Sequence, residues 1–154
     1  MIRRKQSPTA LNKRGTKVYL DGFTFDSQKE ADFYERFIKS CGYDYDVHPR
    51  YHLTDLTSIG PVKVPSISYT PDFVVYDEAG RIKHVYDVKN SFGVYGIDGS
   101  VKLRFKLFAL HEGVPVEAVV VRKHDFKAEL QGTTKSQKEP LVTHSVDYEW
   151  TELI

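Results

Sequence analysis

Two segments in the middle of the chain are rich in β-branched and aromatic residues, and a short polar stretch separates them. The segments span residues 70–76 and 82–89, and Asp77-Glu78-Ala79-Gly80-Arg81 between them has the composition of a turn. This pattern predicts an antiparallel β-hairpin. We expect the hairpin to belong to a larger mixed sheet.

Apolar residues recur at helical spacing before this hairpin. The run from Phe25 to Ile38 predicts a helix with Ser27 as its N-cap and with Cys41-Gly42 closing it. Tyr34 and Phe37 follow Glu30 at i+4 and i+7, so they share one stripe of the helix with it. The spacing therefore places a carboxylate on the helix face that is expected to meet the core.

The same reasoning predicts the remaining elements. Residues 17–25 predict a hairpin around Asp21-Gly22, residues 100–111 a helix, and residues 116–121 a buried strand parallel to its neighbour after a helical crossover. The helix at 100–111 is apolar on two sides and must be covered on both. The predicted fold class is α/β, with a mixed β-sheet flanked by helices.

Composition indicates one domain in a reducing compartment. The chain has 154 residues, 40% of them hydrophobic, which is enough for a single core. Its one cysteine, Cys41, excludes an intrachain disulfide framework. No apolar run is long enough to span a bilayer, and residues 1–5 lead into a polar segment without a signal-peptide core. We expect a soluble cytoplasmic protein with no membrane partner.

Charge divides the chain into three parts. The formal net charge is only +1, but the N-terminal arm, residues 1–16, is basic and contains no acid. Such an arm either contacts nucleic acid or is a solvated terminus. Residues 17–130 are expected to form the folded domain. Residues 131–154 are expected to be a polar linker and a C-terminal tail containing Trp150, which could dock on the domain or on a partner subunit.

The central hairpin also positions charged side chains. If its register is symmetric, with Asp77 opposite Ile82, then Asp72 lies across from Asp87 with Cβ atoms roughly 4.5–5.5 Å apart. Because side chains alternate along a strand, Lys89 shares the face of Asp87. Like charges directly opposite one another destabilise a sheet. The pair therefore requires a counter-charge.

A divalent cation is the natural counter-charge for this pair. Mg²⁺ prefers oxygen ligands and is usually held by one or two carboxylates together with a substrate phosphate. Lys89 could orient or activate the attacking water and offset charge in the transition state. The arrangement predicts metal-dependent cleavage of phosphodiesters. The alternative is a surface hairpin whose charges are solvated or ion-paired.

Glu30 is a third candidate carboxylate, and it has two interpretations. Ser27-x-x-Glu30 is a capping box, in which the glutamate only satisfies an amide at the helix start. However, Glu30 also lies on the buried stripe of its helix, where a site residue explains a carboxylate better than a solvated charge does. We therefore include Glu30 in the candidate site.

The order of Glu30, Asp72, Asp87 and Lys89 along the chain, with the residues around them, resembles the motif pattern of the PD-(D/E)XK nuclease superfamily. The resemblance covers about residues 15–125 and depends on an ordered set of motifs: Phe25-x-Ser27-x-x-Glu30, Tyr69-Thr70-Pro71-Asp72-Phe73 and Asp87-Val88-Lys89. Within the superfamily, the chain looks like small phage-encoded endonucleases and Holliday-junction resolvases. The resemblance implies a restriction-endonuclease-like fold.

The resemblance also implies a role for each matching residue. Asp72 and Asp87 would be metal ligands, together with the carbonyl of Val88. Glu30 would be an outer ligand that completes a second metal site or binds through water, and Lys89 would be the catalytic lysine. The implied cofactor is Mg²⁺, with Mn²⁺ able to substitute.

DNA contacts are implied in two regions. The helix at 100–111 would pack beside the active site, where Lys102 and Lys106 either contact phosphates or only cover the core with their aliphatic stems. The basic arm would supply further contacts from Arg3, Arg4, Lys13 and Arg14.

The expected function is therefore a Mg²⁺-dependent endodeoxyribonuclease. The resemblance alone points to branched or Holliday-junction DNA, to phage recombination or packaging in the host cytoplasm, and to a homodimer. A different class of function is a DNA-binding subunit that keeps the fold but is inactive without a partner, although the intact set of Glu30, Asp72, Asp87 and Lys89 argues against it. The six histidines show no His-x-His or His-Glu-x-x-His spacing, which argues against zinc chemistry.

Overall fold

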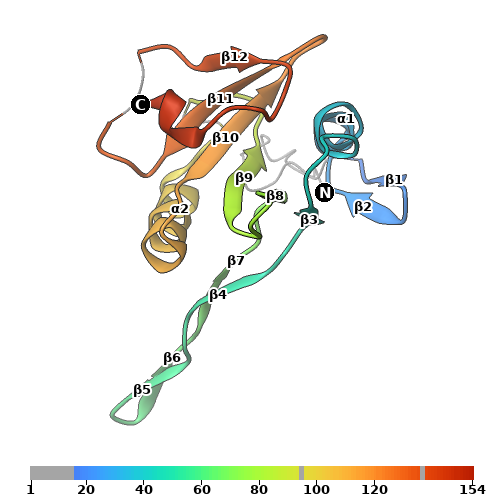
Figure 1. The fold of residues 1–154 in the computed structure, drawn as a ribbon. Helices are drawn as coiled ribbons and strands as arrows, with labels where there is room; N and C mark the ends of the chain where they lie inside the picture. Colours follow the sequence, from blue (N-terminus) through green and yellow to red (C-terminus); the bar gives the residue numbers. More distant parts are fainter. Residues whose placement is uncertain (1–15, 94–95, 136–137) are drawn as a thin grey trace, which may run out of the picture.

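A mixed sheet forms the centre of the protein (Figure 1). The computed structural model describes residues 16–93, 96–135 and 138–154. The sheet has six strands in the order β12-β11-β10-β9-β8-β3. Its strands are β3 (Tyr45–Val47), β8 (Phe73–Tyr76), β9 (Ile82–Val88), β10 (Val116–Val121), β11 (Phe126–Gln131) and β12 (Leu141–Thr143). The prediction of a mixed sheet with an antiparallel β8–β9 hairpin is confirmed.

Helices cover the two faces of this sheet. On one face, α1 (Gln28–Phe33) places the Phe33 ring 5.2 Å from the ring of Tyr86 and 5.0 Å from that of Phe126. On the other face, Phe105 and Phe108 of α2 (Gly99–Glu112) pack in a second apolar cluster. The protein is therefore α/β with helices on both faces, as predicted. No helix among the described residues is long and apolar enough to cross a membrane.

The β8–β9 hairpin keeps the predicted register near the site but not at its turn. Three successive pairs follow that register: Phe73 with Tyr86, Val74 with Val85, and Val75 with His84. The amide of Asp72 then donates to the Tyr86 carbonyl at 3.0 Å, which continues the ladder toward Asp87. At the turn, an irregularity pairs Tyr76 with Ile82, so the predicted alignment of Asp77 with Ile82 is wrong. The shift lies at the far end of the hairpin and leaves the carboxylates in place.

The first helix begins as predicted but changes its type along its length. Ser27 is its N-cap, and the Ser27 side chain accepts a hydrogen bond from the Glu30 amide at 3.2 Å. The helical run reaches Ile38 as predicted, but it is an α-helix only as far as Phe33 and changes at Tyr34 to a π-helical turn, η2 (Tyr34–Ile38). The amide of Lys39 bonds to the Tyr34 carbonyl at 2.8 Å, five residues back.

The smaller predicted elements are also present. The hairpin at the start of the domain pairs β1 (Val18–Leu20) with β2 (Phe23–Phe25), and Asp21 and Gly22 between them both have positive φ. Strand β10 pairs parallel with β9 after the α2 crossover. The sheet continues beyond β10, because β11 and β12, which were not predicted, extend it by antiparallel pairing.

A buried hydrogen-bond network fastens the C-terminal segment to the sheet. His84 Nδ1 lies 2.7 Å from Glu117 Oε2, and His84 Nε2 lies 2.9 Å from the carbonyl oxygen of Val146. The Tyr148 hydroxyl donates to Glu117 Oε1 at 2.6 Å and accepts from the Tyr86 hydroxyl at 2.9 Å. Residues 138–154 therefore contribute β12, the 3-10 helix η3 (Trp150–Leu153) and buried side chains to the domain.

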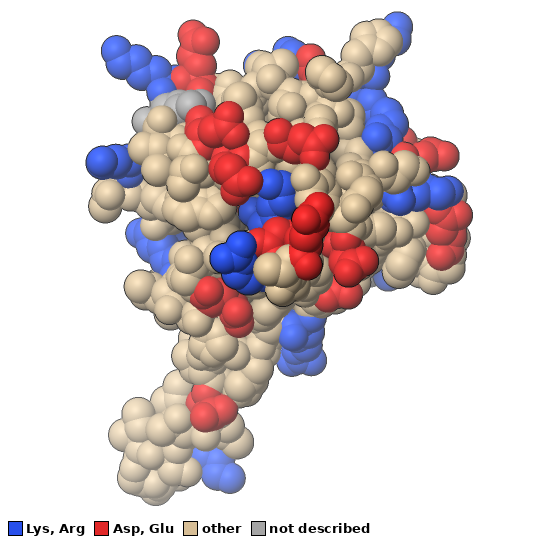
Figure 2. Space-filling model, in the orientation of Figure 1, with Lys and Arg blue, Asp and Glu red and all other residues tan. Residues whose placement is uncertain are grey.

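A two-stranded arm projects from the body (Figure 1). Its base pairs β4 (Tyr51–Thr54) with β7 (Ile67–Tyr69), and its outer part pairs β5 (Thr57–Ile59) with β6 (Val62–Val64). Apolar side chains are exposed along the outer part, among them Leu56, Ile59 and Val62. The surface of the arm carries little charge (Figure 2).

We predict that Tyr148→Phe destabilises the fold. The substitution leaves Glu117 Oε1 and the Tyr86 hydroxyl without their buried partner, which should lower the free energy of unfolding by about 1–3 kcal/mol. Urea denaturation measures the change. The control is Tyr19→Phe, at a side chain that is 77% exposed, which should change the free energy of unfolding by less than about 0.5 kcal/mol. Equal effects of the two substitutions would contradict the role of the network.

Candidate active site

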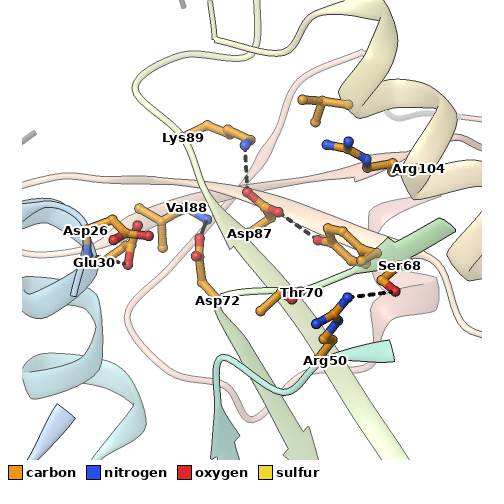
Figure 3. A pocket seen from close by; sticks show the side chains of 12 residues that line it. Asp26, Glu30, Arg50, Ser68, Thr70, Asp72, Asp87, Val88, Lys89 and Arg104 are labelled. Carbon is orange, nitrogen blue, oxygen red and sulfur yellow. Dashed lines mark hydrogen bonds and ion pairs between the residues drawn. The ribbon is translucent and has the colours of Figure 1, made fainter. Parts of the chain in front are cut away.

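A cavity of about 600 Å³ opens where β8 begins and β9 ends. Its lining includes every candidate catalytic residue and metal ligand named from the sequence: Glu30, Asp72, Asp87, Val88 and Lys89. They come from three places in the chain, namely α1, the residue before β8, and the end of β9 (Figure 3). The structure therefore brings the predicted set together at one cavity.

The opposite strand, β9, fixes the carboxylate of Asp72. Its Oδ2 accepts a hydrogen bond from the Val88 amide at 2.6 Å, which fixes the carboxylate on the cavity wall. Its Oδ1 accepts no hydrogen bond from a described residue and lies 3.9 Å from His48 Nε2. Burial raises the pKa of Asp72 well above its usual range, and the charges of Asp87 and Glu30 raise it further. The Val88 amide and Lys89 oppose these effects only in part.

Asp87 is held between a phenol and an ammonium group. The Tyr69 hydroxyl donates to Asp87 Oδ2 at 2.6 Å, and Lys89 Nζ lies 2.7 Å from Asp87 Oδ1. Burial raises the pKa of Tyr69 well above its usual value, and Asp87 raises it further, so Tyr69 remains a donor. Lys89 Nζ also lies over the ring of Phe105, 5.8 Å from its centroid, so α2 helps to position the lysine.

Lys89 stays charged in this environment. Burial alone would lower its pKa, but the neighbouring Asp87 outweighs that effect and raises the pKa of Lys89 above its usual value. Asp72 and Glu30 act in the same direction. The cavity therefore holds an ammonium group beside closely placed carboxylates.

Glu30 lies at the helix start and at the cavity wall at once. Its Oε2 accepts a hydrogen bond at 3.2 Å from the amide of Asp26, one residue before the N-cap, so only the Ser27 half of the predicted capping box forms. The same oxygen lies 3.2 Å from His48 Nε2, and the residue is 7% exposed at the cavity wall. The capping and site roles therefore do not exclude each other.

His48 is a neighbour of the site that sequence reasoning missed. Its ring packs beside Phe73, and its amide donates to the Asp72 carbonyl at 3.0 Å. The hydrogen bond with Glu30 raises the pKa of His48, although burial partly opposes this. Its φ of 52° is uncommon for a residue other than glycine. A local spacing motif could not find it, because its acidic neighbours come from other elements.

Basic residues at the cavity also differ from those predicted. Arg104 of α2 lines the cavity, whereas Lys102 and Lys106 on the same helix are exposed and do not. Arg50, just before β4, lines the cavity as well. The predicted contact residues of the basic arm, Arg3, Arg4, Lys13 and Arg14, lie outside the described residues.

The donor set suits a hard divalent cation. The free Oδ1 of Asp72, the Asp87 carboxylate and the nearby Glu30 offer the oxygen ligands that Mg²⁺ and Mn²⁺ prefer. Burial and the charges of Asp87 and Glu30 raise the pKa of Asp72, and a bound cation would oppose these effects. Asp26, Glu30 and His48 form a neighbouring group, whose potential ligand atoms all lie within 4.8 Å of one another. Glu30 belongs to both sets and joins them.

Comparison with known proteins identifies the family. Residues 12–136 match a family described as "Protein of unknown function (DUF1064)". The chain belongs to this family. The DUF1064 segment contains all the cavity residues from Asp26 to Arg104, together with β10 and β11. No curated protein and no solved structure matches the chain.

We predict that Asp72→Asn stabilises the metal-free protein. Asparagine can keep the hydrogen bond with the Val88 amide, and it removes the ionisation that the folded state opposes. A gain of about 1 kcal/mol would raise the melting temperature by roughly 2–4 °C. The exposed Asp44→Asn is the matched control and should leave the melting temperature unchanged.

The sign of the pH dependence follows from the raised pKa of Asp72. The contribution of Asp72 to the free energy of unfolding is fully present below the pKa of an aspartate in the unfolded chain, about 3.9. It is lost as the pH rises through the raised pKa of Asp72 in the folded protein. The advantage of Asp72→Asn should therefore be largest at about pH 8 and shrink toward about pH 5. An advantage that is constant with pH, or absent, would contradict the repulsion between the carboxylates.

Proposed function

We propose that this protein is a metal-dependent nuclease that hydrolyses phosphodiester bonds in DNA. The observation that carries the proposal is the convergence of Asp72, Asp87 and Lys89 in one cavity, with Glu30 beside them. Buried like charges destabilise a fold unless a cation or a substrate group compensates for them. A function that uses a divalent cation and a phosphate ester accounts for both the carboxylates and the lysine.

Each residue has a chemical role in this proposal. Asp72 and Asp87 would hold Mg²⁺ or Mn²⁺, with Glu30 as an outer ligand, and the bound ion would make water a better nucleophile and offset phosphate charge. Asp87 fixes the Lys89 ammonium group at 2.7 Å, so the lysine can stabilise charge that develops on the phosphate. Tyr69 fixes the other oxygen of Asp87 and keeps that carboxylate from rotating.

The proposal extends to superfamily, substrate and assembly. The ordered motifs around Glu30, Asp72, Asp87 and Lys89 support membership of the PD-(D/E)XK superfamily. Within that superfamily, the resemblance to phage-encoded junction resolvases supports branched DNA as substrate and a homodimer as the active form. Cutting a junction requires two strands to be cleaved, and two copies of one site meet that requirement.

We predict that cleavage requires Asp72, Asp87 and Lys89 together. Asp72→Asn, Asp87→Asn and Lys89→Ala should each reduce cleavage of labelled DNA by about 10²-fold or more, since groups that act as a unit cannot be lost singly. Activity should require Mg²⁺ or Mn²⁺ and stop on chelation. Asp44→Asn again serves as the control and should keep full activity. Each variant is checked for folding by its melting temperature.

The outcomes separate the possible functions. Activity within a few-fold of the wild type in Asp87→Asn would refute the assigned site. Binding of DNA without cleavage, under every metal condition, would instead favour a DNA-binding subunit that depends on a partner. Neither binding nor cleavage of DNA would refute the nuclease proposal altogether.

We further predict selectivity for branched DNA. The protein should be dimeric in solution and should bind a four-way junction at least roughly tenfold tighter than a duplex of the same sequence, about 1.4 kcal/mol. Phosphate contacts alone bind both DNAs, so the difference must come from shape. Affinities are compared at one salt concentration with Ca²⁺ in place of Mg²⁺. Equal affinities would refute the junction-resolvase proposal and leave the nuclease proposal intact.

A further inference from the structure

The arginines in the described part of the chain fall into two groups. Five arginines lie within the described part of the chain, and three of them form ion pairs with nearby carboxylates: Arg36 with Asp32, Arg81 with Asp77, and Arg122 with Asp125. The other two, Arg50 and Arg104, have no carboxylate partner among the described residues. Both line the cavity that holds the candidate active site. Among the five described arginines, the two unpaired guanidinium groups therefore lie at the same cavity.

These two arginines come from elements that are far apart in the sequence. Arg50 precedes β4 at the base of the arm, and its closest polar contact is a long one, 3.5 Å from Nη2 to Ser68 Oγ. Arg104 lies on α2, one residue before Phe105, which packs against Lys89. Both residues are exposed, and neither guanidinium group supports the core. Structural demands alone do not account for their convergence.

Charge is separated along the cavity. Figure 3 shows Asp26 and Glu30 at one end and Arg50 and Arg104 at the other, with Asp72, Asp87 and Lys89 between them. The guanidinium groups lie on the same cavity as several carboxylates, yet they pair with none of them. A ligand that fits this distribution has one anionic group near the carboxylate end, where a cation can bridge the charges, and another beside the arginines.

A nucleic-acid strand has this repeating arrangement of anions. Arginine suits phosphate because its planar group donates two parallel hydrogen bonds to phosphate oxygens. We propose that Arg50 and Arg104 form a phosphate clamp that binds the strand backbone next to the phosphodiester that is cut. This inference rests on the proposed nuclease function. It assigns the clamp to residues that the sequence analysis did not include, and it specifies a substrate with at least two successive phosphates.

The experiment measures DNA affinity rather than cleavage alone. Arg50→Gln and Arg104→Gln should each weaken binding of a labelled oligonucleotide by about tenfold, with Ca²⁺ present to prevent cleavage. Each should also reduce the slope of log K against log salt by about 1, because one phosphate contact is lost. Arg81→Gln is the matched control: it removes the same charge at an exposed site paired with Asp77, and it should change neither quantity.

A second comparison tests the substrate length. With Mg²⁺, the wild type should cleave an oligonucleotide far faster than a dinucleotide, which has a single phosphodiester and cannot fill the clamp. The double variant Arg50→Gln/Arg104→Gln should lose most of this preference, because the longer substrate no longer gains the two additional phosphate contacts. Arg50→Lys and Arg104→Lys should give intermediate affinities, since lysine keeps the charge but not the two parallel bonds.

The clamp and the nuclease function can fail separately. If the wild type binds and cuts DNA but the glutamine variants keep its affinity and salt slope, the clamp is refuted and the nuclease proposal stands. If Arg81→Gln weakens binding as much as the other two variants, net charge explains the effect and the clamp is again refuted. If the wild type neither binds nor cuts DNA, both proposals fail. Melting temperatures equal to that of the wild type show that the variants are folded.

Discussion

The register between β8 and β9 is the constraint on which the candidate site depends. It continues past Phe73 and Tyr86, so that two carboxylates from different strands meet at one edge of the cavity. A shift of one residue would send Asp87 to the opposite face of the sheet. Placing Asp72 and Asp87 side by side destabilises their ionised forms, since burial and mutual repulsion raise the pKa of Asp72. Main-chain pairing therefore holds in place an arrangement that the side chains oppose.

The central strand β9 serves two purposes with alternate residues. Asp87 and Lys89 face the α2 side, where Phe105 and Tyr69 pack around them. His84 and Tyr86 face the opposite side and bind the C-terminal segment through Glu117 and Tyr148. The two polar systems lie back to back across one layer of backbone. The network on the far side thus stiffens the strand that carries the site.

Much of the fold and the core of the site follow from local patterns in the sequence. The hairpin, the helix start at Ser27 and the crossover to β10 depend on turn residues, capping and hydrophobic period, which short segments reveal. The π-helical turn at Tyr34 and the irregularity beside Tyr76 depend on tertiary packing and were not predicted.

The missed site residues have a similar cause. His48, Arg50 and Arg104 carry no spacing motif. Arg50 and Arg104 line the cavity because the base of the two-stranded arm and α2 meet there, and His48, after β3, contacts Glu30 beside it. The outer part of the two-stranded arm lies outside both that cavity and the core. Residues 55–66 are all exposed and belong to neither core cluster, whereas Arg50 and Ser68 at the base line the cavity. Evolution can therefore lengthen, shorten or replace the outer hairpin without disturbing the chemistry below it.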